Sequence, residues 1–244
     1  MSRAWRVAVV ASAVVVITAL NGAARAADVH EVDLEGMLAP RRALPRVAPP
    51  ALSLVWVDAA SAATGSERSA REEAQRLLRA LGVAASWRSG RPGDPVRPGE
   101  LRVILLDRRA ADAEGSPVLG ATPDHFDGDP FFWVHVPSVR EALGLDPRRP
   151  VAPTELRDRH VLGIAIGRVI AHEAVHALAP AVPHGVGLMA ARLKRGDLLA
   201  KTLPVGGELG SAFRAALAVR DAVAADSGLA QGRLLAVGAE ATRY

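Results

Sequence analysis

Two histidines and a glutamate stand close together in the second half of the chain, as His172-Glu173-Ala174-Val175-His176, the pattern H-E-x-x-H. On a helix, residues four apart lie one turn apart on the same face, with Cβ atoms about 5–6 Å apart. Both imidazoles can then reach one zinc ion, at about 2.0–2.1 Å each. Glu173 projects about 100° round the helix from His172. There it can act as general base for a metal-bound water without ligating the metal. The motif therefore predicts a zinc site with ligands His172 and His176 and with Glu173 as the catalytic base.

A third zinc ligand is expected after the motif, because catalytic zinc sites usually combine three protein ligands with one open position. His184 stands eight residues beyond His176. Between them, Pro180 ends the helix and allows the chain to turn back toward the metal. Asp197 and Glu208 are the alternative third ligands, since other enzymes with this motif take a later carboxylate.

The tract HEAVHALAPAVPHGVGLM, residues 172–189, resembles the metzincin zinc metalloproteases and is closest to matrixin-like sequences. Their signature is H-E-x-x-H-x-x-G-x-x-H, followed by a turn whose methionine lies beneath the metal. Met189 takes the place of that methionine. The chain departs from the signature in two ways: Ala179 replaces the glycine, and His184 comes two residues later than the family's third histidine. We interpret the difference as a longer turn broken by Pro180.

This resemblance implies a zinc cofactor, a peptide or protein substrate and a zincin-like α/β (α+β) fold. Such a fold has a mostly parallel twisted sheet with one antiparallel edge strand above the cleft, an active-site helix and a C-terminal helix. A peptide would dock along the edge strand, for which the short segment Val118 to Ala121 is the candidate.

Other candidate sites are weaker. Residues 124–129 are rich in aspartate but lack a recognised calcium-ligand spacing. His160 lies twelve residues before His172, about 120° away round the helix, so it should not share the site. His135 is expected to be satisfied within a strand. The remaining two histidines, His30 and His125, are placed near the mature N-terminus and in a loop. Gly185 to Ala190 fits a G-x-G-x-x-A pattern but follows a helix, which excludes a dinucleotide site.

The helices and strands that must position these residues are predicted from the spacing of apolar residues and from the glycines and prolines that end each element. Thr154 to Ala179 is expected to be one long helix, apolar enough to be buried. A second helix is predicted behind a capping box at Ser69 to Glu72, with Gly82 as its stop. Short apolar runs predict five strands, and the last packing helix is expected at Leu209 to Ala225. The strand segments are 52–57, 83–87, 101–106, 118–121 and 131–136, the last of them stopped by Pro137. Most of the sheet therefore precedes the buried helix, which argues for a mixed α/β domain.

The N-terminus predicts export. Residues 1–26 have basic Arg3 and Arg6, an apolar run and a small-x-small cleavage site, typical of a signal peptide. The alternative is a membrane anchor, but the apolar run of 14 residues is shorter than the roughly 20 that a span needs. Residues 27–50 are a linker or short pro-segment, and 51–244 the metalloprotease domain. Secretion or a periplasmic location is expected, without stable membrane insertion after cleavage.

The charge and the cysteine content of the chain exclude nucleic-acid-binding proteins and proteins that depend on cysteine chemistry. The signal peptide carries three of the 30 basic residues and no acidic one, so 27 basic residues face 26 acidic ones in the mature chain. With no basic stripe, nucleic-acid binding is excluded. The absence of cysteine excludes disulfides and thiol nucleophiles.

The sequence thus favours an exported zinc-dependent endopeptidase. An exported zinc-binding module without catalytic activity is the alternative, and a metal-free scaffold with a chance motif is a third interpretation. The sequence leaves the oligomeric state open.

Overall fold

The computed structural model of the chain describes residues 49–123 and 130–222. The predicted signal peptide, nearly all of the predicted linker, His30, His125 and the aspartate-rich segment lie outside these residues. Those predictions therefore stay predictions.

Five strands form one sheet in the order β2-β1-β3-β5-β4. The four parallel ones are β1 (Ala51–Val57), β2 (Ala84–Ser89), β3 (Glu100–Leu106) and β5 (Phe131–His135). The fifth, β4 (Gly120–Ala121), is antiparallel to β5 and forms an edge of the sheet. Strand β1, which lies between β2 and β3, is buried along most of its length, which explains its nearly continuous apolar sequence. The predicted mixed α/β fold, with a mostly parallel sheet and a short edge strand, is confirmed.

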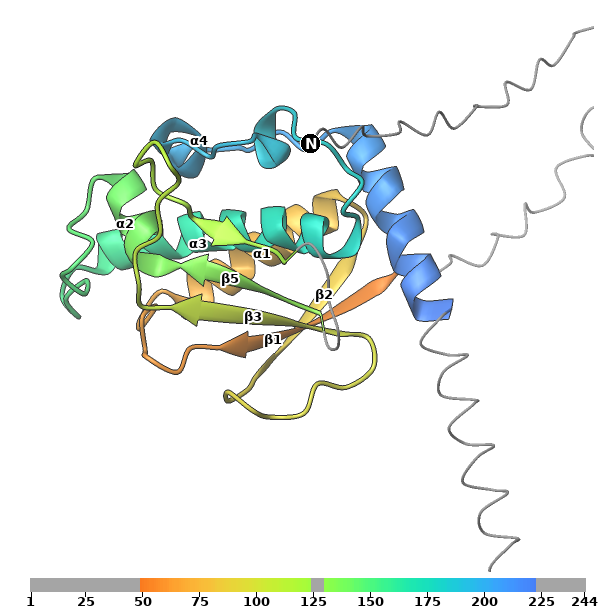
Figure 1. The fold of residues 1–244 in the computed structure, drawn as a ribbon, viewed down its shortest axis with the longest axis horizontal. Helices are drawn as coiled ribbons and strands as arrows, with labels where there is room; N and C mark the ends of the chain where they lie inside the picture. Colours follow the sequence, from red (N-terminus) through yellow and green to blue (C-terminus); the bar gives the residue numbers. More distant parts are fainter. Residues whose placement is uncertain (1–48, 124–129, 223–244) are drawn as a thin grey trace, which may run out of the picture. The chain divides into compact units, whose positions relative to one another are not determined.

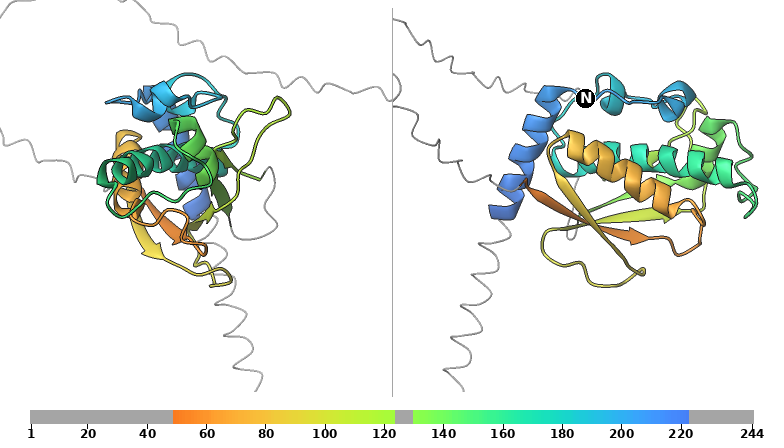
Figure 2. Two further views of the ribbon diagram at one scale, coloured as in Figure 1. Left: turned by 90° about the vertical axis from the view of Figure 1, so that its left-hand side faces the viewer. Right: turned by 180° about the vertical axis from the view of Figure 1, so that it is seen from behind.

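Two helices cover one face of this sheet (Figures 1 and 2). They are α1 (Glu67–Ala80) and α3 (Leu156–Leu178), which pack against each other. Two glycines of α3 permit this close approach. A Cβ at Gly163 would lie 2.6 Å from the carbonyl oxygen of Ser66, and a Cβ at Gly167 would lie 2.5 Å from the carbonyl oxygen of Ala70. The predicted burial of the long helix is confirmed. In the described residues α3 is the one helix with the length and hydropathy of a membrane span, and 72% of its most apolar window is buried inside the protein.

The predicted capping box at Ser69 is wrong. Helix α1 begins at Glu67 with Ser66 at its N-cap, and Ser69 lies inside the helix. The Ser69 hydroxyl instead lies 2.9 Å from Nδ1 of His160 on α3. The start of the helix is set by the preceding turn, where the Asp58 carboxylate accepts hydrogen bonds from two backbone amides, at 2.7 and 3.0 Å.

Pro137 lies at the start of a helix as well as just after a strand. Strand β5 continues directly into α2 (Val136–Leu143), a helix that the sequence analysis missed, and Pro137 lies in its first turn. Proline is well tolerated there because the first amides of a helix have no intrahelical acceptor. Gly144, with φ of 78°, ends the helix in the left-handed conformation.

The chain after α3 folds back over that helix through short elements. These are the 3-10 turn η2 (Gly187–Met189), α4 (Arg195–Leu199) and a helix over residues 207–222. That last helix was predicted for 209–225 and is confirmed over its described part. The buried guanidinium of Arg168, on α3, binds Glu73 at 2.8 Å and the carbonyl oxygens of Asp197 and Ala200. These contacts hold α1, α3 and the α4 segment together.

Candidate metal centre

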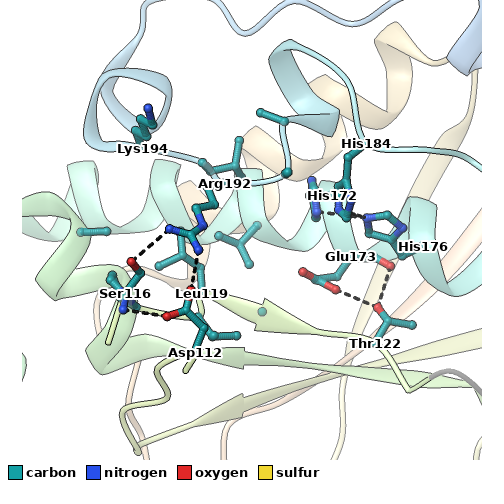
Figure 3. Close-up of a pocket in the computed structure, with 18 of the residues that line it drawn as sticks. Asp112, Ser116, Leu119, Thr122, His172, Glu173, His176, His184, Arg192 and Lys194 are labelled. Atoms are coloured by element: carbon teal, nitrogen blue, oxygen red, sulfur yellow. Dashed lines mark hydrogen bonds and ion pairs between the residues drawn. The ribbon is translucent and has the colours of Figure 1, made fainter. Parts of the chain in front are cut away.

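The last two turns of α3 carry His172, Glu173 and His176. The helix ends at Leu178, and Ala179 leaves the helical conformation because it precedes Pro180. A turn closed by the hydrogen bond from Val182 N to Ala179 O, 2.9 Å long, then reverses the chain. This reversal brings His184 back to the pair of histidines on the helix (Figure 3).

Three imidazole nitrogens converge at this point. Nε2 of His176 lies 3.1 Å from Nε2 of His172 and 3.1 Å from Nε2 of His184. In the described residues, these three side chains form the one cluster of potential ligands compact enough for a metal ion, with ligand atoms within 4.8 Å of one another. Two nitrogens bound to a tetrahedral zinc ion stand about 3.3 Å apart, close to the separations found here.

The orientation of His172 is set by the turn η2. Its Nδ1 donates a hydrogen bond to the carbonyl oxygen of Leu188, 2.8 Å away, so Nε2 carries the lone pair that faces the cluster. The turn itself needs glycine at position 187. Gly187 has φ of 62°, and a Cβ there would lie 2.2 Å from the carbonyl oxygen of Pro204. Met189 is buried at the end of this turn.

Hydrogen bonding among neutral imidazoles cannot satisfy this arrangement. Nε2 of His172 can only accept, so it needs a proton on Nε2 of His176. That proton removes the lone pair with which His176 would accept from His184. Burial lowers the pKa of His172, and it lowers the pKa of His176 to about 4, with contributions from the neighbouring imidazoles. Three neutral nitrogens pointing at one another are therefore suited to a cation, and the donor set fits zinc.

Glu173 lies beside the three histidines and outside their cluster (Figure 3). Its residue is 7% exposed, and burial raises the pKa of its carboxyl group to about 7. The hydroxyl of Thr122, directly after β4, donates to Oε2 of Glu173 at 2.8 Å and opposes part of that rise. A buried carboxylate with a pKa near neutrality is suited to accept and return a proton.

A cavity of about 690 Å³ extends from the histidines between β4 and residues 190–195. Leu119 and Val169 are among the apolar side chains that line it. At its far end Arg192 bridges the two sides with an ion pair to Asp112 at 2.8 Å (Figure 3). Arg192 also forms an ion pair with Glu114 at 2.5 Å. The cavity thus adjoins both the three histidines and Glu173.

The structure thus brings together the ligands predicted first, His172, His176 and His184. It places the alternative ligands elsewhere. The Asp197 carboxylate accepts a hydrogen bond from the amide of Lys194 at the start of α4, and Glu208 is exposed in the last helix.

The remaining predictions about histidine also hold for the described residues. His160 is outside the cluster, and His135 is buried with Nδ1 3.3 Å from the carbonyl oxygen of Arg108. Sequence reasoning missed Thr122, Gly120 and Arg192. Thr122 and Gly120 had one available signal, their place in or directly after the predicted edge strand.

No protein-family model, curated protein or solved structure matches this chain. The resemblance to metzincins therefore rests on residues 172–189 alone.

Proposed function

We propose that the protein is an exported zinc-dependent endopeptidase with a zincin-like fold. The observation that carries this proposal is the convergence of three imidazole nitrogens beside a buried carboxylate, at the open edge of a sheet. A purely structural metal site would have no need of the carboxylate or of the adjoining cavity, because structural zinc sites are closed by four protein ligands.

The roles of the residues follow from their positions. His172, His176 and His184 would hold the zinc ion. A bound zinc ion would supply Lewis acidity for the scissile carbonyl and lower the pKa of a water molecule toward 7. Glu173 accepts the proton of the attacking water at its carboxylate and passes it to the leaving amine. The Leu188 carbonyl keeps His172 in the tautomer that leaves Nε2 free for the metal.

The edge strand β4 offers a docking line for an extended peptide. The amide of His135 donates to the carbonyl oxygen of Leu119 at 2.8 Å, and Gly120 pairs with Val134 as the next residue along. In an antiparallel ladder, alternate residues direct their backbone groups to opposite sides. The amide and carbonyl of Gly120 therefore face away from β5, toward the free edge, where a substrate strand could bind them.

A Glu173→Gln variant tests the mechanism. It should keep the zinc content of the wild-type protein and lose cleavage of an unstructured protein by about 100-fold or more. Glu208→Gln, which changes an exposed glutamate outside the cluster, is the matched control and should cleave like the wild type.

Full activity of Glu173→Gln would refute the proposed mechanism. Zinc binding without any cleavage by the wild type would favour the alternative, an exported zinc-binding module. A folded wild-type protein that binds no zinc would leave the motif without chemical meaning.

A further inference from the structure

The Glu173 carboxylate is fixed from the side of the sheet. Thr122 Oγ1 lies 2.8 Å from Oε2 of Glu173 and 3.3 Å from its backbone carbonyl oxygen. The hydroxyl therefore contacts the side chain and the main chain of the same residue, which restrains the side chain relative to the helix. Within the described part of the chain, Oε2 receives this hydrogen bond and Oε1 receives none.

The backbone of β4 forms the other restraint. A Cβ at Gly120 would lie 2.7 Å from both Cγ and Oε1 of Glu173, and 2.8 Å from Cγ1 of Val169. The glutamate side chain thus lies directly against the strand, in space that any residue other than glycine would fill. Together Gly120 and Thr122 leave the carboxylate little freedom to rotate.

We infer that Thr122 is a positioning residue for Glu173, holding Oε2 so that Oε1 remains free to exchange the proton in catalysis. This inference rests on the proposed function. Without the hydroxyl, a buried carboxylate with no other hydrogen-bond donor among the described residues can turn about its side-chain bonds. General-base catalysis depends on placement to within a fraction of an ångström, and a misplacement of about 1 Å can cost about 100-fold in rate.

The segment that holds Glu173 would also bind the substrate. Thr122 directly follows the two residues of β4, along which a peptide would bind. The same short segment would then set the position of the scissile bond and the position of the carboxylate. A shift of β4 would move both together, which preserves their relative geometry.

The test compares Thr122→Val, which keeps the side-chain shape and removes the hydroxyl, with Thr122→Ser, which keeps the hydroxyl. In Thr122→Val, kcat should fall about 10- to 100-fold while KM changes less than about threefold. Zinc content should stay at the wild-type value, and the thermal midpoint should fall only by the small amount that the loss of one buried hydrogen bond implies. Thr122→Ser should restore most of kcat, and Thr154→Val, at an exposed threonine, should behave as the wild type.

Two results would overturn the inference. In the first, Thr122→Val keeps the wild-type kcat. In the second, kcat falls in both Thr122 variants together with an equal loss of zinc and of thermal stability. Crystal structures of the zinc-loaded wild type and of Thr122→Val provide a readout that needs no activity. The Glu173 carboxylate should leave its place beside Gly120 in the variant, and an unmoved carboxylate would refute the positioning role. A wild type that cleaves nothing would refute the proposed function, while this structural comparison would still decide the role of Thr122.

Discussion

Replacement of His184 by alanine should weaken zinc binding by about 100- to 1,000-fold. Structural zinc sites with four ligands bind with about 10–16 kcal/mol, or roughly 2.5–4 kcal/mol per ligand. Each 1.4 kcal/mol corresponds to about a tenfold change in Kd. His184 supplies one of the three converging nitrogens, 3.1 Å from that of His176. The loss of one ligand therefore gives the expected range.

His184 is the most informative of the three proposed ligands to remove, because it is exposed whereas His172 is only 8% exposed. Truncation of His172 would also leave a cavity and an unpaired Leu188 carbonyl, and its effect on folding would be mixed with its effect on zinc. Truncation of His184 removes little packing. The change in Kd should therefore report coordination.

The assay is a competition titration of the metal-free protein against a chromophoric zinc chelator at neutral pH. His160→Ala is the matched control, since His160 is an exposed histidine on the same helix that contacts Ser69 and lies outside the cluster. A change in Kd of less than about threefold for His184→Ala would refute the three-histidine site. Asp197→Asn and Glu208→Gln would then identify the third ligand.

Two further predictions concern stability. Arg168→Met should lower the free energy of unfolding by about 3–5 kcal/mol, measured by urea denaturation, because it leaves the buried Glu73 and two carbonyl oxygens short of donors. Arg76→Met, at a side chain 44% exposed, should cost less than about 1 kcal/mol, and equal effects would contradict this assignment. For Glu100, the bidentate Arg88 guanidinium lowers the carboxyl pKa from its ordinary 4.5 to about 2. Its stabilising effect, about 3 kcal/mol, is present above pH about 4.5 and lost as the pH falls toward 2. The wild type should thus lose its advantage over Glu100→Gln in that window, and a pH-independent difference would contradict the role of this pair.

The order and type of the main elements could be predicted from the sequence, because their signals are local. The apolar runs that form β1, β3 and β5 and the long apolar pattern of α3 each lie within one element. Errors arose where a tertiary contact competed with a local signal. Ser69 has the spacing of an N-cap, yet it lies inside α1 and contacts His160 on another helix. The short helix α2 was missed because Pro137 directly follows a strand and was interpreted only as its end.

Within the candidate site, the sequence by itself predicted the two helical histidines as a ligand pair and the glutamate beside them as a base. The spacing of His172, Glu173 and His176 has one consequence on any helix, since helical geometry alone places the two imidazoles on one face. The third ligand remained a choice among three residues, because the path of the chain after Pro180 depends on what it packs against.

Tertiary structure alone decided which residues complete the centre. Hydrogen bonds from Val182 to Ala179 and from Leu188 to Pro204 shape the return of the chain that brings His184 to the helix. The hydroxyl that holds Glu173 belongs to Thr122, 51 residues away in sequence. No local periodicity encodes such a contact, because it exists only once the edge strand has packed against the buried helix. A motif of five residues could thus predict a metal centre, while the fold determined which third histidine joins the pair, the adjoining cavity and the placement of Glu173.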